Sequence, residues 1–391
     1  MMVFKYDISD IAAQDMECFR DMTAYVSSYI ISIDKTENGE MYFNITDGHA
    51  DEVRRKLDIL KNSLSESKYD CSVEEKVFFS TADHQTLNNA SIYEELLGRE
   101  DIIKITDGVY AYGGLFLKVY NYFSEYFSKA AREMFGSELL EYKVPVLYPA
   151  KEYERGKYFE NFPHHIMFQT LIKNDIEVLE RFAEKSMDNG KLLEEMQVPK
   201  NVLRHAACVP VYKWNENTVR KYESSKKYLI SGKCFRNEDK NVCELLRLNE
   251  FYMKEIVFIG KPAQVAENLE YSRQHLWFEL IDKFGLVAEV KGANDSFFAS
   301  NYKKLRLFQK LGESKFEFRM YIPARDTTLA VGSSNLHRTH FTMEYGIRTP
   351  EEYCHSGCIA YGIDRLAYAF LCQKGLDIDK WDEYSRNEII K

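Results

Sequence analysis

Two short stretches carry residue types that suit the binding of a nucleotide. The first, residues 234–260 (CFRNEDKNVCELLRLNEFYMKEIVFIG), predicts a strand, a polar loop and a second strand. Arg236 can bind a phosphate with its planar guanidinium, Glu238 can accept from an amino group, and Phe251 can stack on a purine. Arg247 closes the loop. A hairpin with solvated charges would show the same residues, so this stretch alone leaves both interpretations open.

The second stretch is residues 354–373 (CHSGCIAYGIDRLAYAFLCQ), where a short strand meets a helix. Gly362 permits another group to approach the backbone closely, and Arg365 lies in the first helical turn. An arginine at the start of a helix is often merely solvated. This segment therefore decides nothing by itself.

Together, the two stretches resemble motifs 2 and 3 of the class II aminoacyl-tRNA synthetases. The pattern is Arg-x-Glu, a loop and Arg-x-x-Glu-Phe, followed about a hundred residues later by Gly, an apolar residue, Asp and Arg. The resemblance implies that ATP is a substrate. It also implies that a helix from residue 115 and a strand at 143–148, with Pro145, form motif 1, which is the dimer interface in that class.

The resemblance assigns roles to the two motifs. Arg236 and Arg365 are the implied catalytic residues, with Arg236 on the α-phosphate and Arg247 and Arg365 at the β/γ end. Adenine would lie between Phe251 and Arg365, with Glu238 completing the ATP-binding set.

A more detailed resemblance is to the amino acid:[carrier protein] ligases, truncated relatives of the atypical zinc-dependent archaeal seryl-tRNA synthetases. It covers residues 105–391 and does not clearly include 1–104. It implies activation of a small amino acid and transfer to the phosphopantetheine thiol of an acyl or peptidyl carrier protein by a homodimer. A seryl-type tRNA ligase and a non-catalytic regulatory protein on the same fold are the alternatives. The segments that carry the resemblance are DGVYAYGGLF (107–116), YFENFPHH (158–165), HAACVPVY (205–212), EIVFIGKP (255–262), GANDSFF (292–298), KFEFRMYIP (315–323), SSNLHRTHF (333–341) and GLDIDKWDEYSR (375–386).

The same resemblance implies a zinc site. The ligands of the family, two cysteines and one glutamate, correspond to Cys208, Glu255 and Cys358. Three protein ligands leave a fourth position open, as expected where a substrate binds the metal, here through its amino group. Without the resemblance, the two cysteines would be interpreted as ordinary buried thiols.

The sequence departs from the wider class at two places. Ala360 replaces the first glycine of motif 3, and its methyl group near the ATP either narrows the pocket or is harmless. Residues 329–335 (LAVGSSN) hold no acid where seryl enzymes carry a Mg²⁺-binding glutamate. Ser334 and Asn335 are the polar substrate-site candidates there, and Glu317 is the nearest plausible carboxylate for Mg²⁺.

A segment between the two motifs is expected to meet the carrier protein. The predicted helix 263–284 falls where the family carries a carrier-docking helix. Arg273 and the basic stretch 303–319 would offer positive charge to an acidic partner, with Trp277 as an apolar anchor. Alternatively, the helix merely covers the sheet.

The elements that must position these residues predict an α+β protein of two parts. Residues 1–104 contain strands at 2–7, 28–34, 40–46 and 74–80 and helices at 9–26 and 50–64, the order of a ferredoxin-like domain, and then a connector. From residue 105 strands cluster between helices, which favours an antiparallel sheet flanked by helices. The expected strands are at 143–148, 164–171, 206–212, 229–237, 250–259, 315–322 and 327–333. The adjacent His164 and His165 would point to opposite faces of one of them, so we expect them to be structural.

Charge and composition narrow the partners. Residues 1–104 contain 11 Lys and Arg against 21 Asp and Glu, a net charge of −10, whereas the whole chain of 391 residues carries −9. An acidic N-terminal part makes tRNA an improbable partner, since tRNA binding neutralises phosphates. Eight scattered cysteines without a CxxC pair indicate reduced thiols. Without a signal peptide or an apolar run of membrane-spanning length, a cytoplasmic protein that does not enter a membrane is expected.

Overall fold

A computed structural model of the protein describes residues 1–65, 76–185, 190–295, 297–298, 304–305, 309 and 313–390. In it, the N-terminal part is a small sheet backed by two helices. Its strands pair antiparallel in the order β1-β3-β2. Alternate apolar residues of the strands and one face of each helix enclose a core around Phe19 and Phe43. The elements are β1 (Met2–Asp7), α1 (Ala13–Thr23), β2 (Ile30–Glu37), β3 (Glu40–Ile45) and α2 (Ala50–Ser65).

The predicted ferredoxin-like sheet is wrong in its fourth strand. β4 (Val77–Ser80) leaves the N-terminal part and pairs antiparallel with β13 (Ala288–Gly292) at the edge of the large sheet. Phe78 lies against Phe316 and Phe79 against Phe278, with ring centroids 4.7 and 4.6 Å apart. The two aromatic side chains thus have their apolar partners in the large sheet and its helices, which explains the strand's place.

Eight of the described strands form one large, mostly antiparallel sheet, with the order β4-β13-β14-β15-β16-β12-β11-β7. The β7–β11 pair is parallel. This sheet confirms the expected α+β architecture. Its remaining strands are β7 (Leu139–Lys143), β11 (Lys226–Phe235), β12 (Glu250–Gly260), β14 (Lys315–Ile322), β15 (Thr327–Arg338) and β16 (His355–Gly362).

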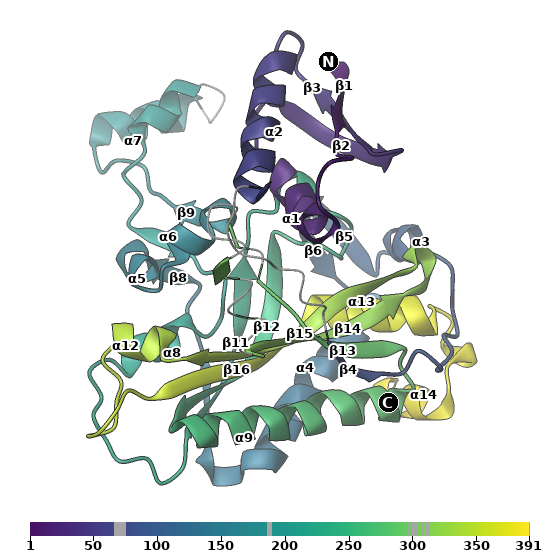
Figure 1. Ribbon diagram of the computed structural model, residues 1–391, viewed down its shortest axis with the longest axis vertical. Helices are drawn as coiled ribbons and strands as arrows, with labels where there is room; N and C mark the ends of the chain where they lie inside the picture. Colours follow the sequence, from purple (N-terminus) through teal and green to yellow (C-terminus); the bar gives the residue numbers. More distant parts are fainter. Residues whose placement is uncertain are drawn as a thin grey trace.

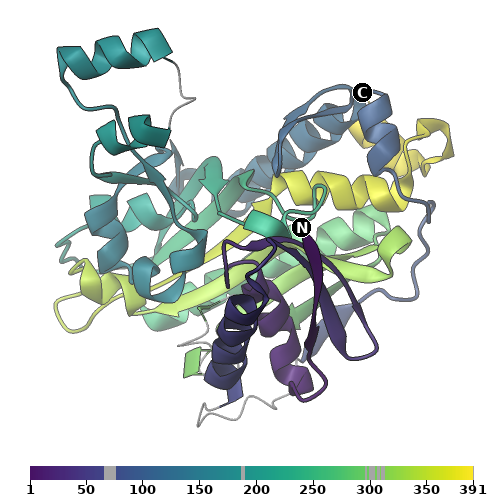
Figure 2. The same ribbon diagram turned by 90° about the horizontal axis from the view of Figure 1, so that it is seen from above.

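The two faces of the large sheet have different coverings. Ile256 and Phe258 of β12 face a core made with the long helices, whereas Val257 and Ile259 face a second apolar cluster that contains Tyr153 and both Cys208 and Cys358. Figures 1 and 2 show the N-terminal domain and the long helices on opposite sides of the sheet. The long helices are α4 (Gly114–Phe135), α9 (Pro262–Arg273), α10 (Glu279–Phe284), α13 (Ile363–Lys374) and α14 (Glu383–Ile389). A π-helical turn, Gln274–Phe278, joins α9 to α10.

Shorter elements complete the second face and the rim. A three-stranded sheet has the order β8-β10-β9, and β5 pairs with β6 as a hairpin. Helix α7 projects from the body in Figure 1. The bounds are α3 (Tyr93–Gly98), β5 (Ile102–Thr106), β6 (Val109–Tyr112), β8 (Leu147–Pro149), α5 (Ala150–Arg155), α6 (Tyr158–Asn161), β9 (Met167–Gln169), α7 (Ile176–Lys185), β10 (Asn201–Leu203), α8 (Val209–Trp214) and α12 (His340–Glu344).

One predicted strand, 206–212, is wrong and two are only partly right. Of 143–148 only the two ends lie in strands, β7 and β8, and of 164–171 only β9 (Met167–Gln169) is a strand. Residues 206–212 run into helix α8, whose first turn contains Pro210, a residue whose fixed φ suits that position. His164 and His165 lie in a 3₁₀ turn and not on a strand, and their ring centroids are 4.0 Å apart. Within the described ranges, no helix is both long and apolar enough to cross a membrane.

Candidate active site

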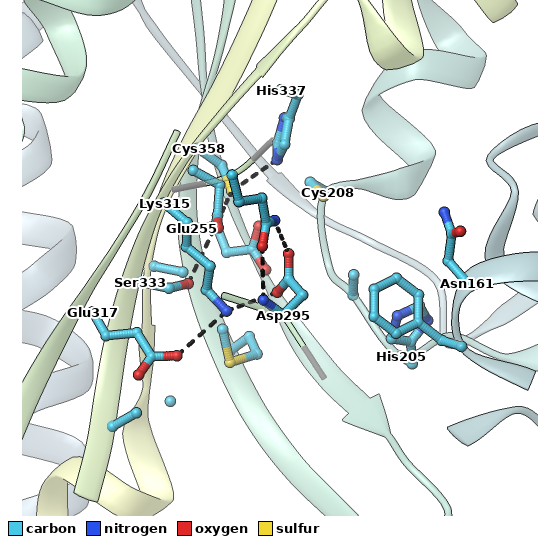
Figure 3. A pocket seen from close by; sticks show the side chains of 18 of the residues that line it. Asn161, His205, Cys208, Glu255, Asp295, Lys315, Glu317, Ser333, His337 and Cys358 are labelled. Atoms are coloured by element: carbon cyan, nitrogen blue, oxygen red, sulfur yellow. Dashed lines mark hydrogen bonds and ion pairs between the residues drawn. The ribbon is translucent and has the colours of Figure 1, made fainter. Parts of the chain in front are cut away.

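Most of the predicted site residues, but not Arg247 and Ser334, line a cavity of about 510 Å³ on the sheet face opposite α4 and α9. A second cavity of about 380 Å³ shares Arg236, Glu238 and Arg365 with it and reaches helix α1. Figure 3 shows part of the lining, in which β14, β15 and β16 supply one wall. The two cavities together offer adjoining spaces of the size that small ligands occupy.

Cys208, Glu255 and Cys358 come together at the first cavity. Their ligand atoms all lie within 4.8 Å of one another, and all three residues are buried. The register explains the pair on the sheet: Cys358 of β16 lies opposite Val257 of β12, so Glu255, two residues along, is its diagonal neighbour on the same face. Cys208 directly precedes α8 and reaches the pair from the helix start. Such a set of donors suits a soft divalent cation such as zinc.

The charges of these donors depend on their burial. Burial and the neighbouring Cys358 raise the pKa of Glu255 to about 8. Its Oε1 accepts from the backbone N–H of Ala207 at 3.3 Å, whereas Oε2 has no partner among the described residues. The hydrogen bond with Cys208 lowers the pKa of Cys358, whose Sγ also lies 3.6 Å from Nδ2 of Asn335 and 3.8 Å from Nε2 of His337. A thiolate at Cys358 beside an unpartnered carboxylate oxygen fits a cation.

Arg236 and Phe251 already contact each other. Arg236 follows the last residue of β11, and its guanidinium lies over the Phe251 ring at 5.1 Å from the centroid. Its Nε is 3.5 Å from the carbonyl oxygen of His205. A purine that stacks on Phe251 therefore has to share the ring with Arg236 or displace it.

Arg247 has an unexpected partner from the N-terminal domain. Its Nη2 lies 2.7 and 2.9 Å from the carboxylate oxygens of Asp21 on α1, and its Nη1 donates to Glu238 at 3.3 Å. Two further bonds join the same surfaces: Asn241 donates to the Asp21 carbonyl at 2.9 Å, and Tyr25 donates to the Asn237 carbonyl at 2.8 Å. The N-terminal domain therefore closes over the loop that the sequence assigns to ATP.

Arg365 lies in the first turn of α13 and lines both cavities. Burial lowers its pKa to about 10, so the guanidinium stays protonated at neutral pH. Its Nη1 is 3.4 Å from the carbonyl oxygen of Ala330. A half-buried, protonated arginine that lines both cavities can meet an anionic ligand.

Glu317 of β14 lies between two cations, 3.3 Å from Lys315 and 2.7 Å from Arg319. Burial acts to raise its pKa, but the two cations hold it below the usual range. Glu317 is thus an ionised carboxylate on the wall of both cavities. The sequence assigned no role in the site to Lys315, whose Nζ also lies 2.7 Å from Oδ1 of Asp295. Only the GANDSFF resemblance pointed to that aspartate.

Ser334 lies on the wrong face of the sheet for a substrate residue. Its Oγ accepts from Arg273 of α9 at 3.1 Å, on the side of the long helices. Its neighbours Ser333 and Asn335 line the cavity, because successive strand residues point to opposite faces. Ser333 therefore replaces Ser334 among the residues that face the cavity, and Asn335 keeps its place.

The docking residues predicted on the helix 263–284 are wrong in detail. Trp277 is fully buried against Phe318, with ring centroids 5.8 Å apart, because the helix packs on the sheet. Arg273 is held by Ser334 and Glu270 and stacks on the Phe316 ring at 4.5 Å. Neither side chain is free for a partner. The basic stretch 303–319 lies in part outside the described residues.

Comparison with known sequences finds relatives among ligases, whereas no protein-family model matches. An amino acid–[acyl-carrier-protein] ligase of Bradyrhizobium diazoefficiens is 28% identical over 278 residues, 71% of this chain and 83% of the relative. A type-2 serine–tRNA ligase of Methanothermobacter thermautotrophicus is 26% identical over 286 residues, 71% of this chain and 55% of the relative. The type-2 ligase of Methanocaldococcus jannaschii is 28% identical over 258 residues and is matched over 49% of its length. The chain thus matches only about half of these serine–tRNA ligases.

Comparison with solved structures gives the same fold. The seryl-tRNA synthetase of M. kandleri, crystallised with A. aeolicus tRNASec, superposes with a TM-score of 0.73 at 20% identity, covering 93% of this chain and 74% of the other. The cytoplasmic serine–tRNA ligase of Naegleria fowleri, solved with AMP, gives a TM-score of 0.58 at 11% identity, covering 83% and 74%. The ligase relatives and this shared architecture place the chain in the class II aminoacyl-tRNA synthetase superfamily.

Proposed function

We propose that this protein activates a small amino acid with ATP and transfers it to the phosphopantetheine thiol of a carrier protein. The observation that carries the proposal is the buried Cys208–Glu255–Cys358 cluster in the same cavity as Arg236 and Arg365. A site for an amine and a site for phosphates then adjoin, as the formation of an aminoacyl-adenylate requires. The ligase relatives support ATP-dependent aminoacylation.

The three donors fit zinc. Two cysteines and one glutamate converge without a fourth protein ligand within the described part of the chain, and one carboxylate oxygen of Glu255 lacks a partner. Zinc sites of this composition leave a position open for a substrate. Bound here, zinc would hold the amino group of the amino acid and so discriminate against acids without one.

The chain's own residues would then position the reacting groups. In the first step a carboxylate oxygen of the amino acid bonds to the α-phosphorus of ATP, and the bond from that phosphorus to pyrophosphate breaks. Arg236 would neutralise the α-phosphate, and Arg365 the departing end. Glu317, ionised between Lys315 and Arg319, is the carboxylate that we assign to Mg²⁺ on the nucleotide.

In the second step the carrier's thiol gives its proton to solvent, its sulfur bonds to the aminoacyl carbon, and the bond from that carbon to the phosphate oxygen breaks, so that AMP leaves as an anion. The phosphopantetheine sulfur must reach the carboxyl carbon held between the metal donors and Arg236. No acid–base residue has to change its charge for this, since AMP is a good leaving group. Positioning by the cavity is therefore the main contribution of the protein.

The space beside the metal donors supports a small substrate. Asn335 and His337 both contact Cys358, and Tyr212 in turn lies 3.0 Å from Nδ1 of His337. These side chains fill the surroundings of the cluster on the β15 side. An amino acid of the size of glycine or alanine is accordingly expected, because a longer side chain would meet these groups.

The choice of acceptor rests on two observations. The sequence match spans 83% of the carrier-protein ligase but only 55% of a type-2 serine–tRNA ligase. Residues 1–104 carry a net charge of −10, which opposes the binding of a polyanion. The seryl-type tRNA ligase remains the second candidate, because the M. kandleri enzyme, whose structure contains tRNA, covers 93% of this chain.

A homodimer belongs to the same proposal. β7 forms one edge of the large sheet and leaves Leu140 and Tyr142 exposed. It follows α4 in the segment that the sequence compares with motif 1. An edge strand with exposed apolar side chains is suited to pairing with a second copy.

The test of the proposal has two arms. Amino-acid-dependent exchange of pyrophosphate into ATP, run over all twenty amino acids, should show turnover with glycine or alanine and little with aromatic or long charged ones. Purified protein should then be offered tRNA and phosphopantetheinylated carrier protein side by side. Aminoacylation of tRNA alone would reject the carrier protein and leave the tRNA ligase, and no exchange with any amino acid would reject the adenylate.

A further inference from the structure

Arg204 is a buried cation with almost no partners. Its side chain is fully enclosed. Its Nη1 donates to the Ala207 carbonyl at 3.3 Å, whereas Nε and Nη2 have no hydrogen-bond partner in the part of the chain that the structure describes. An isolated charge in a protein interior is strongly unfavourable, so a compensating anion is expected near it.

The metal donors Cys208, Glu255 and Cys358 are the groups that can carry this compensating negative charge. The backbone of Ala207 bridges the two sites: its carbonyl accepts from Arg204, and its N–H donates to Glu255 at 3.3 Å. Arg204 is thus joined to the cluster through the backbone of Ala207, and it does not line either cavity.

A count of charges explains why a cation is placed there. Two thiolates and one carboxylate carry −3, and a divalent metal ion reduces this to −1. A buried net charge of −1 needs one further positive charge. We propose that Arg204 supplies it and is the positioning residue that, through the backbone of Ala207, holds Glu255 in place for the metal. The inference rests on the metal site of the proposed function.

The backbone around Arg204 fixes the guanidinium in this place. Its N–H donates to the Val146 carbonyl at 3.1 Å, and its carbonyl accepts from the Phe235 N–H at 2.9 Å. Gly232 on β11 leaves the necessary space, because a Cβ there would collide with Nη2 of Arg204. Gly232→Ala therefore displaces the charge without removing it.

The experiment measures zinc directly. Wild type, Arg204→Gln, Arg204→Lys and Gly232→Ala are loaded with zinc, and zinc affinity is obtained by competition with a colorimetric chelator. Arg132→Gln is the matched control, since Arg132 is an exposed partner of Glu125 and Glu141 and its loss changes the net charge equally. Melting temperatures are recorded for each protein with and without zinc.

We expect Arg204→Gln to weaken zinc binding about 10- to 100-fold, the usual effect of removing a group that supports metal ligands. Arg204→Lys should restore part of the affinity, Gly232→Ala should lose part of it, and the control should match wild type. The gain in melting temperature on adding zinc should shrink in Arg204→Gln. A merely structural arginine would instead lower both melting temperatures equally and leave the affinity unchanged, which would overturn the inference.

Two outcomes separate this inference from the proposed function. If wild type holds zinc and the variants bind it equally well, Arg204 is not the counter-charge and the metal site stands. If wild type binds no zinc, both the metal site and the inference are wrong. Should Arg204→Gln fail to fold, the Lys variant and Gly232→Ala decide the question, because unchanged affinity in both contradicts the proposal.

Discussion

The contact between Asp21 and Arg247 predicts that the N-terminal domain competes with ATP. The resemblance to motif 2 implies that Arg247 binds the β/γ end of the triphosphate, but here Asp21 holds it at 2.7 and 2.9 Å. A phosphate that approaches Arg247 must either displace the Asp21 carboxylate or bind next to it, where the two negative charges repel each other. Asp21→Asn removes the charge and keeps the size of the side chain. It also keeps the backbone carbonyl that Asn241 contacts.

The size of the effect follows from the geometry. Two like unit charges about 6 Å apart repel by about 0.7 kcal/mol in water and by about 3 kcal/mol at an effective dielectric constant of about 20. The side chains of Arg247 and Asp21 are 33% and 21% exposed, so the value near the lower end applies. About 1 kcal/mol corresponds to a roughly fivefold tighter binding of ATP.

The assay is the KM for ATP in amino-acid-dependent pyrophosphate exchange, measured at low and high salt. Asp21→Asn should lower this KM about fivefold, and the difference should shrink with salt because the charges are partly exposed. Asp58→Asn is the matched control. It removes the same charge from the same domain, at a carboxylate that accepts from Tyr6 at 2.7 Å and lies outside the cavities. A raised KM in Asp21→Asn would show that Asp21 holds Arg247 ready for ATP, and an unchanged KM would show that the contact is irrelevant to the nucleotide.

Three further predictions concern the metal, the phosphate and the loss of folding stability at acidic pH. Purified protein should hold about one zinc per chain, and elemental analysis should find it lost in Cys208→Ala and Cys358→Ala but kept in Cys372→Ala, a buried thiol outside the cluster. Arg236→Ala should slow pyrophosphate exchange about a hundredfold or more with an unchanged circular dichroism spectrum, and near-normal exchange would remove this residue from the mechanism. Burial lowers the pKa of His164 from 6.5 to about 3 in the folded protein. Between these two pH values the unfolded chain binds a proton at His164 that the folded protein does not. The free energy of unfolding therefore falls by about 1.4 kcal/mol per pH unit as the pH drops below 6.5 toward 3. His164→Phe should reduce this loss in melting scans between pH 7 and 5, and an identical acid dependence would contradict the assignment.

The sequence predicted the positions of helices and strands better than it predicted which of their side chains face the cavity or the core. The spacing of apolar residues located α4, the helix 263–284 and α13, because helices of this length have a strong period. Whether a polar residue faces the cavity depends on strand phase, and a shift of one residue placed Ser334 on the far side of the sheet. Trp277 was misjudged for another reason: a large apolar side chain on a helix suits either the buried face or a docking anchor, and here it is buried against Phe318.

Contacts across the chain lay beyond sequence reasoning altogether. Asp21 and Arg247 are 226 residues apart, and no pattern in either segment links them. The convergence of Cys208, Glu255 and Cys358 was expected only from resemblance, since the three come from separate elements. Arg204 could not be recognised as buried, because the strand and the turn around it are short and a single arginine in such a segment is ordinarily solvated.

The position of β4 sets an order of assembly for the growing chain. Among the described residues, the strands before Ser65 pair in one small sheet of their own, so this sheet can form as soon as it leaves the ribosome. β4 follows at once but must wait for β13: Thr81 bonds to Ala288, 207 residues later in the chain. Until then Phe78 and Phe79 lack their aromatic partners and stand on an unpaired strand, a segment prone to aggregate. Closing this long loop is an inherently slow step, and refolding from denaturant should show β4 docking as a late phase that Phe79→Ala slows.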